Sequence, residues 1–183
     1  MFEQDVILVD EQDKPVGSMK KMEAHQKGLL HRAFSVFIFN SDGEMLLQQR
    51  AKNKYHSGGL WTNACCSHPN PGEDIQTAAS RRLKEEMGFT TELKKIFDFI
   101  YRSSFENGLT EFEFDHVFIG VYNDPFDPNK NEVSDYAFKN LDEIRSLLKQ
   151  QPELFTAWFH IAFPMLEKWV NENAWLKTGA ANS

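Results

Sequence analysis

The sequence predicts an α/β or α+β fold in which a mixed β-sheet is sandwiched between helices. Short apolar runs bounded by turn residues recur along the chain, and other segments carry apolar residues at helical spacing. The longest strand candidate, residues 111–122, is apolar on both faces, which is typical of a central strand covered on both sides. At 183 residues the chain matches the prior of roughly 100–200 residues per domain, so we expect a single domain over residues 1–183.

Composition and charge exclude several classes of protein. Hydrophobic residues make up 41% of the chain and aromatic residues 13%, as in globular proteins. The net charge of −7 argues against nucleic acid as a partner, because a phosphate backbone requires a basic surface. No segment reaches the ~18 consecutive apolar residues of a membrane span, and no signal-peptide pattern is visible. The adjacent Cys65 and Cys66 are poorly placed for a disulfide, which favours a reduced, cytoplasmic protein, and we expect a monomer.

The N-terminal half alternates apolar runs with turns. Turn residues 10–15 end the first strand, and segment 19–30 then supplies Lys20, Lys21, His25 and Gly28 before the next strand begins at His31. Asp42-Gly43 predicts a hairpin, and a polar loop over residues 50–59 ends in glycine. Residues 74–87 predict a helix that Gly88 closes as a C-cap. The expected strands are residues 6–9, 33–39, 44–49 and 61–68.

The C-terminal half adds strands and two helices. A turn at residues 105–108 separates strand 96–102 from the long strand 111–122, and the Pro- and Asp-rich loop 123–131 precedes a short strand at 134–138. Asn140 is a candidate cap for a helix over residues 141–149. Thr156 is a candidate cap for a last helix that Pro164 is expected to kink, and residues 178–183 are expected to fray.

Helix 74–87 carries charge within its apolar stripe. Ile75, Ala79 and Leu83 define the buried face, yet Arg82 and Glu86 fall inside it at 100° per residue. A charge taken out of water must be paired or bind a ligand. The alternative is an ordinary i,i+4 ion pair on the helix surface, worth about 0.2–0.5 kcal/mol. We favour a functional role, because perturbed charges often mark a site.

The long strand has acidic residues on one of its faces. Glu111, Glu113 and Asp115 share this face by the period of two, and neighbouring carboxylates about 7 Å apart repel each other unless a cation or a shared proton relieves them. The alternative, that this end of the strand emerges into solvent, is equally compatible with these residues alone.

Three histidines favour a bound cation over exposure of these carboxylates to solvent. Imidazole together with carboxylate suits Zn²⁺, Mn²⁺ or Fe²⁺. His68 shares a strand face with Cys66, and two further histidines bracket the entry to the hairpin. The candidate histidine ligands are His25, His31 and His68, whereas we interpret His56, His116 and His160 as structural residues.

A longer motif extends from strand 61–68 through the following helix. The pattern Ser67-x5-Glu73-x7-Arg81-Arg82-Leu83-x-Glu85-Glu86-x-Gly88-Phe89 resembles the Nudix box, G-x5-E-x7-R-E-U-x-E-E-x-G-U, with its spacing intact. Ser67 replaces the first glycine and Arg82 replaces a glutamate. In Nudix hydrolases that glutamate belongs to the metal set that activates water. A cation there removes a metal ligand and adds a phosphate binder, which argues against hydrolysis.

Arg82 together with WTNACCSHP resembles type I isopentenyl diphosphate isomerases, Nudix-fold enzymes that do not hydrolyse their diphosphate. The resemblance covers most of the chain and includes KMEAH, LLHRAF, QQRAKNKYHSGGLW, YRSSF, TEFEF and FTAW in the family's order. The family has GHP where this chain has Ser67-His68-Pro69. The resemblance implies interconversion of isopentenyl diphosphate and dimethylallyl diphosphate, in isoprenoid biosynthesis.

The resemblance also implies a role for each site residue. Cys66 and Glu113 would act as acid and base, with Tyr101 assisting the glutamate. One divalent metal (Mn, Zn or Mg) would be held by His25, His31, His68, Glu111 and Glu113, and Glu86 would hold a Mg²⁺ bound with the diphosphate. Substrate would be bound by Lys21, Arg50, Lys54, Arg82 and Trp158, the last through a cation–π contact.

Two rival functions remain. A Nudix hydrolase would cleave a nucleoside diphosphate derivative, and Arg82 argues against it. A catalytically inactive Nudix domain would serve as a ligand-binding or regulatory module, but it would have no need of Cys66, Tyr101 and Glu113 together.

Overall fold

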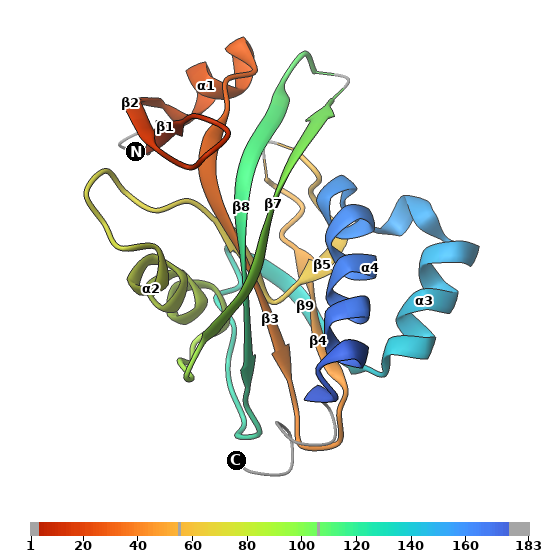
Figure 1. Ribbon diagram of the computed structural model, residues 1–183. Helices are drawn as coiled ribbons and strands as arrows, with labels where there is room; N and C mark the ends of the chain where they lie inside the picture. Colours follow the sequence, from red (N-terminus) through yellow and green to blue (C-terminus); the bar gives the residue numbers. More distant parts are fainter. Residues whose placement is uncertain (1–3, 55, 106, 176–183) are drawn as a thin grey trace.

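The computed structural model describes residues 4–54, 56–105 and 107–175, whose strands form one mixed sheet with helices on both sides (Figure 1). Helix α2 lies on one side, and α3 and α4 lie together on the other. Among these residues no helix is both long and apolar enough to cross a membrane. The strands are β1 (Asp5–Val9), β2 (Pro15–Lys20), β3 (His31–Phe39), β4 (Met45–Arg50), β5 (Trp61–Asn63), β6 (Cys65–Ser67), β7 (Lys94–Ser104), β8 (Thr110–Val121) and β9 (Val133–Lys139). The helices are α1 (Lys21–Lys27), α2 (Ile75–Met87), α3 (Leu141–Gln150), the 3₁₀ turn η1 (Pro152–Leu154) and α4 (Ala157–Glu172).

Strands β3 and β8 form the centre of the sheet. They pair in parallel along their length, with His31 opposite Glu113 and Phe39 opposite Val121. β7 pairs antiparallel with the other edge of β8. β1, β4 and β6 all pair antiparallel with β3. The prediction that the long strand is central and covered on both faces is therefore confirmed.

The strict alternation of β3 divides the core into two clusters. Phe34, Val36 and Ile38 pack with α2, whereas Phe37 and Phe39 pack with α3 and α4. Successive side chains of a strand point to opposite faces, so one apolar run supplies both cores. Whether a residue stands at an odd or an even position along β3 or β8 therefore decides which helix layer its side chain contacts.

Local sequence signals account for several of the observed boundaries. Gly43 closes the turn between β3 and β4, and Gly88 ends α2 with a φ of 85°, in the left-handed region that favours glycine. Asn140 and Glu143 form a reciprocal capping box at the start of α3. The expected fraying of residues 178–183 lies outside the described residues.

Three predictions of local structure differ from what is observed. The sequence predicts no helix or strand over residues 19–30, but this segment includes the end of β2 and the short helix α1. The single strand expected over 61–68 is two strands, because the Asn63 side chain donates to the carbonyls of Val36 and Cys65 and breaks the run at Ala64. Thr156 precedes α4 but makes no side-chain cap, and its hydroxyl donates to Thr62 Oγ1.

Candidate active site

The candidate site lies at the end of β3 and β8 where polar residues replace the apolar core. The sheet register places His31 beside Glu113, Tyr101 beside Glu113 on the opposite edge, and Ser35 beside Cys66. Glu111 and Glu113 are only 5% and 6% exposed. The alternative that this end of the strand emerges into solvent is therefore wrong.

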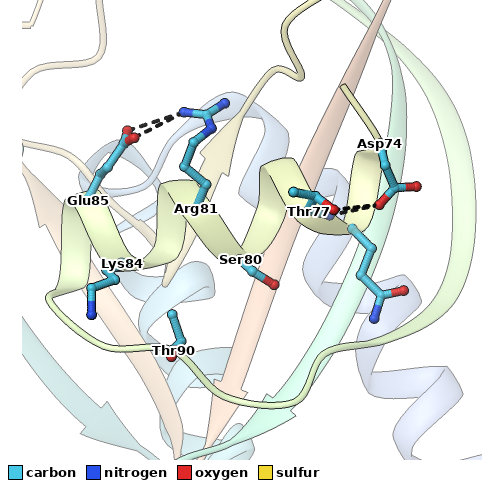
Figure 2. Close-up of a pocket in the computed structure, with 8 residues that line it drawn as sticks. Asp74, Thr77, Ser80, Arg81, Lys84, Glu85 and Thr90 are labelled. Atoms are coloured by element: carbon cyan, nitrogen blue, oxygen red, sulfur yellow. Dashed lines mark hydrogen bonds and ion pairs between the residues drawn. The ribbon is translucent and has the colours of Figure 1, made fainter. Parts of the chain in front are cut away.

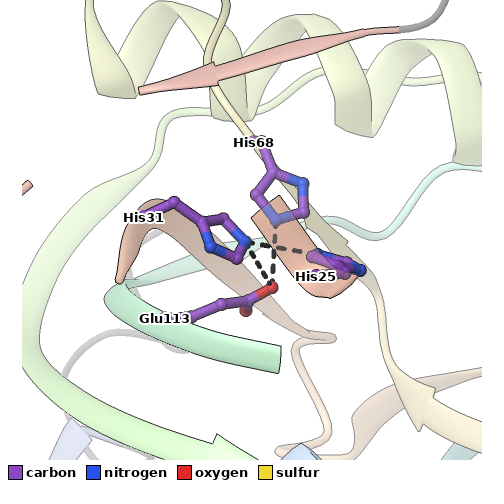
Figure 3. Close-up of side chains that lie close together, drawn as sticks. All are labelled: His25, His31, His68 and Glu113. Carbon is purple, nitrogen blue, oxygen red and sulfur yellow. Dashed lines mark hydrogen bonds and ion pairs between the residues drawn. The ribbon is translucent and has the colours of Figure 1, made fainter. Parts of the chain in front are cut away.

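Three histidines and one carboxylate converge in this region (Figure 3). One ligand atom from each of four residues lies within 4.8 Å of every other, and all four residues are buried. The Nε2 atoms of two histidines face each other at 3.3 Å, and Glu113 Oε1 lies 3.0 Å from His68 Nε2. The four residues, which we call the histidine cluster, are His25, His31, His68 and Glu113.

The chemistry of the histidine cluster fits a divalent metal. His31 Nδ1 lies 2.8 Å from the carbonyl of Leu29, and donation there leaves the lone pair of Nε2 directed into the cluster. Burial, and then neighbouring cationic groups, lower the pKa of His25 and His68 to about 3, so both imidazoles are neutral at physiological pH. Neutral imidazoles with one carboxylate are a ligand set of the kind that binds Zn²⁺, Mn²⁺ or Fe²⁺.

Glu113 connects the histidine cluster to Tyr101. Burial alone would raise the pKa of Glu113, but the contact from His68 Nε2 to its carboxylate outweighs this and holds the pKa well below its usual value. The Tyr101 hydroxyl donates to Glu113 Oε2 at 2.7 Å. Burial, and then the charges of Glu111 and Glu113, raise the pKa of Tyr101, so the phenol keeps its proton.

Glu111 lies outside the histidine cluster, although the family resemblance implies that it is a metal ligand. Its Oε1 lies 3.1 Å from His56 Nε2, and its Oε2 lies 3.1 Å from the Tyr101 hydroxyl, whose single proton also faces Glu113 at the shorter distance. The His56 ring stacks on Phe105 with ring centroids 4.8 Å apart. His56, which the sequence analysis interprets as structural, therefore lies against an acidic residue of the site.

The two adjacent cysteines face opposite sides of the sheet. Cys65 is fully buried in the core beneath α2. Cys66 lies beside Ser35 and donates its thiol hydrogen to Asn63 Oδ1 at 3.0 Å. Burial, and then the neighbouring Asp115, raise the pKa of the Cys66 thiol. The expected alternation of the two side chains is therefore observed.

A small cavity connects these groups. Its volume of about 30 Å³ has room for about one water molecule. A larger ligand would require the lining side chains to move apart. Arg50 lies over the Trp158 ring at 5.2 Å from the ring centroid, and burial lowers the pKa of the Lys21 ammonium. The lining residues are Lys21, Ser35, Arg50, His56, Cys66, Ser67, His68, Tyr101, Glu111, Glu113, Asp115 and Trp158.

Outside the histidine cluster, three expected site residues do not line this cavity. Lys54 forms an ion pair with Glu132. Arg82 Nη2 donates to Glu86 Oε1 at 2.7 Å, and Glu86 also accepts from Gln48 Nε2 at 3.0 Å. The Arg82–Glu86 contact has the i,i+4 spacing of an ordinary pair, but Glu86 is only 6% exposed.

A larger hollow lies on the outer side of α2 (Figure 2), with a volume of about 780 Å³. Arg81 pairs there with Glu85, and Asp74 caps the helix by accepting from Thr77. None of the residues expected in the site lines this hollow, so it is separate from the candidate site.

Three residues in or beside the cavity, Ser35, Asn63 and Asp115, have no role among the predictions from sequence. Asp115 shares the face of Glu111 and Glu113 by the period of two, and this pattern could have identified it. Ser35 and Asn63 carry no such signal, because their positions beside Cys66 depend on the pairing of β3 with β6 and on the break at Ala64. His116 and His160 contact Asp13 and the carbonyl of Pro152, in agreement with their structural interpretation.

Comparisons with known proteins are consistent with this geometry. Residues 29–159 match the NUDIX domain. An isopentenyl-diphosphate Delta-isomerase of Pectobacterium atrosepticum is 55% identical over 159 residues, which cover 87% of this chain and 89% of that protein. An isopentenyl-diphosphate Delta-isomerase 2 of Photorhabdus laumondii is 49% identical over 169 residues, 90% of this chain and 96% of that protein.

The chain belongs to the isopentenyl-diphosphate Delta-isomerase family, within the NUDIX-domain proteins. A crystal structure of a Deinococcus radiodurans protein matches with a TM-score of 0.67 at 18% identity, covering 81% of this chain and 90% of that one. At this identity the match supports the fold alone. The expected Nudix-like mixed sheet between helices is confirmed, as is the membership in the isomerase family predicted from Arg82 and WTNACCSHP.

Proposed function

We propose that this protein interconverts isopentenyl diphosphate and dimethylallyl diphosphate. The reaction adds a proton to one alkene carbon and removes one from the carbon on the other side of the new cation. The observation that carries the proposal is that the Cys66 thiol and the Tyr101–Glu113 pair line the same buried cavity. Isomerases of the family that this chain belongs to bear this activity in their name.

Protonation of an unactivated alkene requires an acid, a base and the exclusion of water. We assign these roles to Cys66 and Glu113, with Tyr101 passing the proton between Glu113 and substrate. The hydrogen bond from Tyr101 to Glu113 supplies the path, and the raised pKa values of Cys66 and Tyr101 keep both protons in place until the substrate takes one. The direction of the reaction decides which group acts first.

Charged and aromatic groups of the cavity suit the rest of the substrate. Lys21 and Arg50 would bind the diphosphate. Trp158 would stabilise the developing carbocation, because a cation over a desolvated indole face gains about 2 kcal/mol. Its ring already contacts the Arg50 guanidinium, so this face accepts a positive charge.

The histidine cluster would hold one divalent cation, with Mn²⁺, Zn²⁺ and Mg²⁺ as candidates. A cation bound there would fix the Glu113 carboxylate in position and offset the negative charge of the site. Glu111 would complete the ligand set only by leaving His56. Glu86 would bind a second Mg²⁺ that arrives with the substrate, and Lys54 and Arg82 would bind the diphosphate. Each of these side chains would first have to leave its present ion pair.

We further propose that the protein is a cytoplasmic monomer.

Incubation with isopentenyl diphosphate and Mg²⁺ in deuterated water tests the activity. We expect deuterium-labelled dimethylallyl diphosphate and no free pyrophosphate or phosphate. Formation of unlabelled product would contradict this mechanism of isomerisation. Recovery of unchanged substrate would also contradict it, provided that the protein is folded and retains its metal. Release of phosphate from a nucleoside diphosphate derivative would instead favour the hydrolase, which Arg82 argues against.

A further inference from the structure

Glu132 is an acidic residue that lies between two of the cations assigned to the diphosphate. It stands directly before β9, and its side chain is 23% exposed. Its carboxylate forms an ion pair with Lys54, and the same oxygen, Oε2, lies 3.7 Å from Arg82 Nη2. One carboxylate oxygen therefore faces both an ammonium and a guanidinium group, as a phosphate oxygen does when two cations bind it.

The backbone holds Glu132 in this position from two sides. The N–H of Ala51 donates to the Glu132 carbonyl at 2.9 Å, which joins Glu132 to the polar loop that carries Lys54. The N–H of Glu132 donates to the carbonyl of Asn129 at 2.8 Å, and the N–H of Asn129 donates to the carbonyl of Glu86 on α2 at 2.8 Å. The carboxylate is thus connected through the backbone to both elements that supply the cations.

The charge of the two cations is already neutralised. Arg82 also pairs with Glu85 Oε2 at 2.6 Å and with Glu86 Oε1 at 2.7 Å. Lys54 and Arg82 together therefore contact three carboxylates, and Glu132 is the one that faces both cations. Its departure would release Lys54 and would lower the negative charge beside Arg82.

An ordinary surface ion pair is the simpler alternative. Such pairs contribute little to stability, and the loss of one would leave ligand binding unchanged. Two observations favour a larger role. A single oxygen of Glu132 faces two cations, and neither Lys54 nor Arg82 lines the cavity while paired with it, although Lys21 and Arg50 do. The pairing thus keeps two cations away from the cavity in which the substrate would bind.

We propose that Glu132 sets the affinity for the substrate, because its carboxylate competes with the diphosphate for Lys54 and Arg82. In the ligand-free protein the carboxylate holds both cations outside the cavity, and the diphosphate binds by replacing it on them. No covalent bond changes in this exchange of one anion for another. The inference rests on the proposed function, which places the substrate's diphosphate on these two cations, but its test uses inorganic pyrophosphate and needs no turnover.

Calorimetric titration with inorganic pyrophosphate, at one fixed ionic strength and Mg²⁺ concentration, tests the competition. Glu132→Gln keeps the shape of the side chain and removes its charge, so pyrophosphate should bind roughly two- to fivefold more tightly, the range for loss of one partly exposed ion pair. Glu132→Ala should change the affinity in the same direction. Glu167→Gln is the matched control and should bind as the parent does, because Glu167 is 19% exposed and pairs with Arg145 on α3, away from the cavity.

A double-mutant cycle with Lys54 shows whether the effect passes through a shared cation. Lys54→Met alone should weaken pyrophosphate binding, and Glu132→Gln should then give a smaller gain than it gives in the parent. In turnover assays, the KM of Glu132→Gln for isopentenyl diphosphate should fall by a factor similar to that for pyrophosphate. The kcat should not rise, because tighter binding of substrate and transition state alike leaves the barrier between them unchanged. Thermal melting and metal content identify any variant that has lost its fold or its metal.

Unchanged pyrophosphate affinity in Glu132→Gln and Glu132→Ala would overturn the proposal, since the pair would then be an ordinary surface contact. Weaker binding would also overturn it, because Glu132 would then orient the cations for the ligand. So would a gain of equal size with and without Lys54, since the two anions would then not compete for this cation. Failure of the parent protein to incorporate deuterium would count against the isomerase activity only, and the pyrophosphate titrations would still decide the competition.

Discussion

The same face of β3 and β8 is apolar at one end and polar at the other. At the apolar end, Phe37, Val117 and Ile119 pack against α3 and α4 and are fully buried. At the polar end, Ser35 and Glu113 are also buried, but they contact hydrogen-bonding groups instead of hydrocarbon. Two stretches of the same strands thus have similar burial and opposite chemistry.

The difference separates the residues that stabilise the fold from the residues that carry the proposed reaction. Burying an apolar side chain contributes about 1.5–3 kcal/mol, whereas a buried carboxylate costs free energy unless it is paired. The rigid apolar end holds the strand register that brings His31 and Tyr101 to either side of Glu113. We therefore expect substitutions at the polar end to affect turnover and those at the apolar end to affect stability.

The largest effect is expected from Cys66 at the polar end. Cys66→Ala should lower kcat by about a hundredfold to ten-thousandfold, the range for loss of a general acid or base. The fold and the metal content should remain, as judged by thermal melting and elemental analysis. Cys65→Ala is the matched control, because Cys65 points into the core beneath α2, and it should retain activity. Loss of activity in the control but not in Cys66→Ala would reverse the assignment of the faces.

At the apolar end, Ile119→Ala should reverse this pattern. It removes a fully buried side chain, and we expect the free energy of unfolding to fall by about 2–5 kcal/mol. The kcat/KM of the folded fraction should stay near the parental value. Urea unfolding and turnover of the same preparation measure the two quantities. A loss of turnover comparable with that of Cys66→Ala would mean that the two ends are not separable.

Periodicity predicted much of this arrangement. The period of two placed Glu111, Glu113 and Asp115 on one face and turned Cys65 and Cys66 to opposite sides, as observed. Its position at the entry to the hairpin made His25 a candidate ligand, but only the motif resemblance placed it in one ligand set with His68, since neither periodicity nor spacing joins the two.

The remainder depends on contacts that no local pattern contains. The parallel register of β3 and β8, which sets His31 beside Glu113, joins segments far apart in the chain. The sequence does not predict β2, because nearly all of its side chains are exposed and the segment has no apolar alternation. The position of His56 beside Glu111 depends on the path of the polar loop 50–59, which sequence alone does not specify.

Acid should destabilise the metal-free protein through the histidine cluster. Folding lowers the pKa of His25 and His68 from 6.5 to about 3, so the unfolded chain binds more protons between these values. The stability is fully present above pH 6.5 and is lost as the pH falls toward 3, at up to about 1.4 kcal/mol per pH unit for each histidine.

Urea unfolding of chelator-treated protein across this pH range measures the slope. His68→Gln should reduce the slope, whereas His160→Gln, outside the histidine cluster, should leave it unchanged. Equal slopes for the parent and His68→Gln would show that His68 titrates alike in the folded and unfolded states, which contradicts its burial as a neutral imidazole.

The smallest effect is expected at the start of α2, on the other side of the sheet. The Asp74 carboxylate accepts from the backbone N–H of Thr77 at 2.9 Å and caps the helix. Asp74→Ala should lower the free energy of unfolding by about 0.5–2 kcal/mol without changing kcat or KM. Asp74→Asn keeps a capping oxygen and is the control, with stability close to that of the parent. If kcat falls in Asp74→Ala but not in Asp74→Asn, the position of α2 is coupled to the cavity across the sheet. The separation between stabilising and catalytic regions would then hold only for the face shared by β3 and β8.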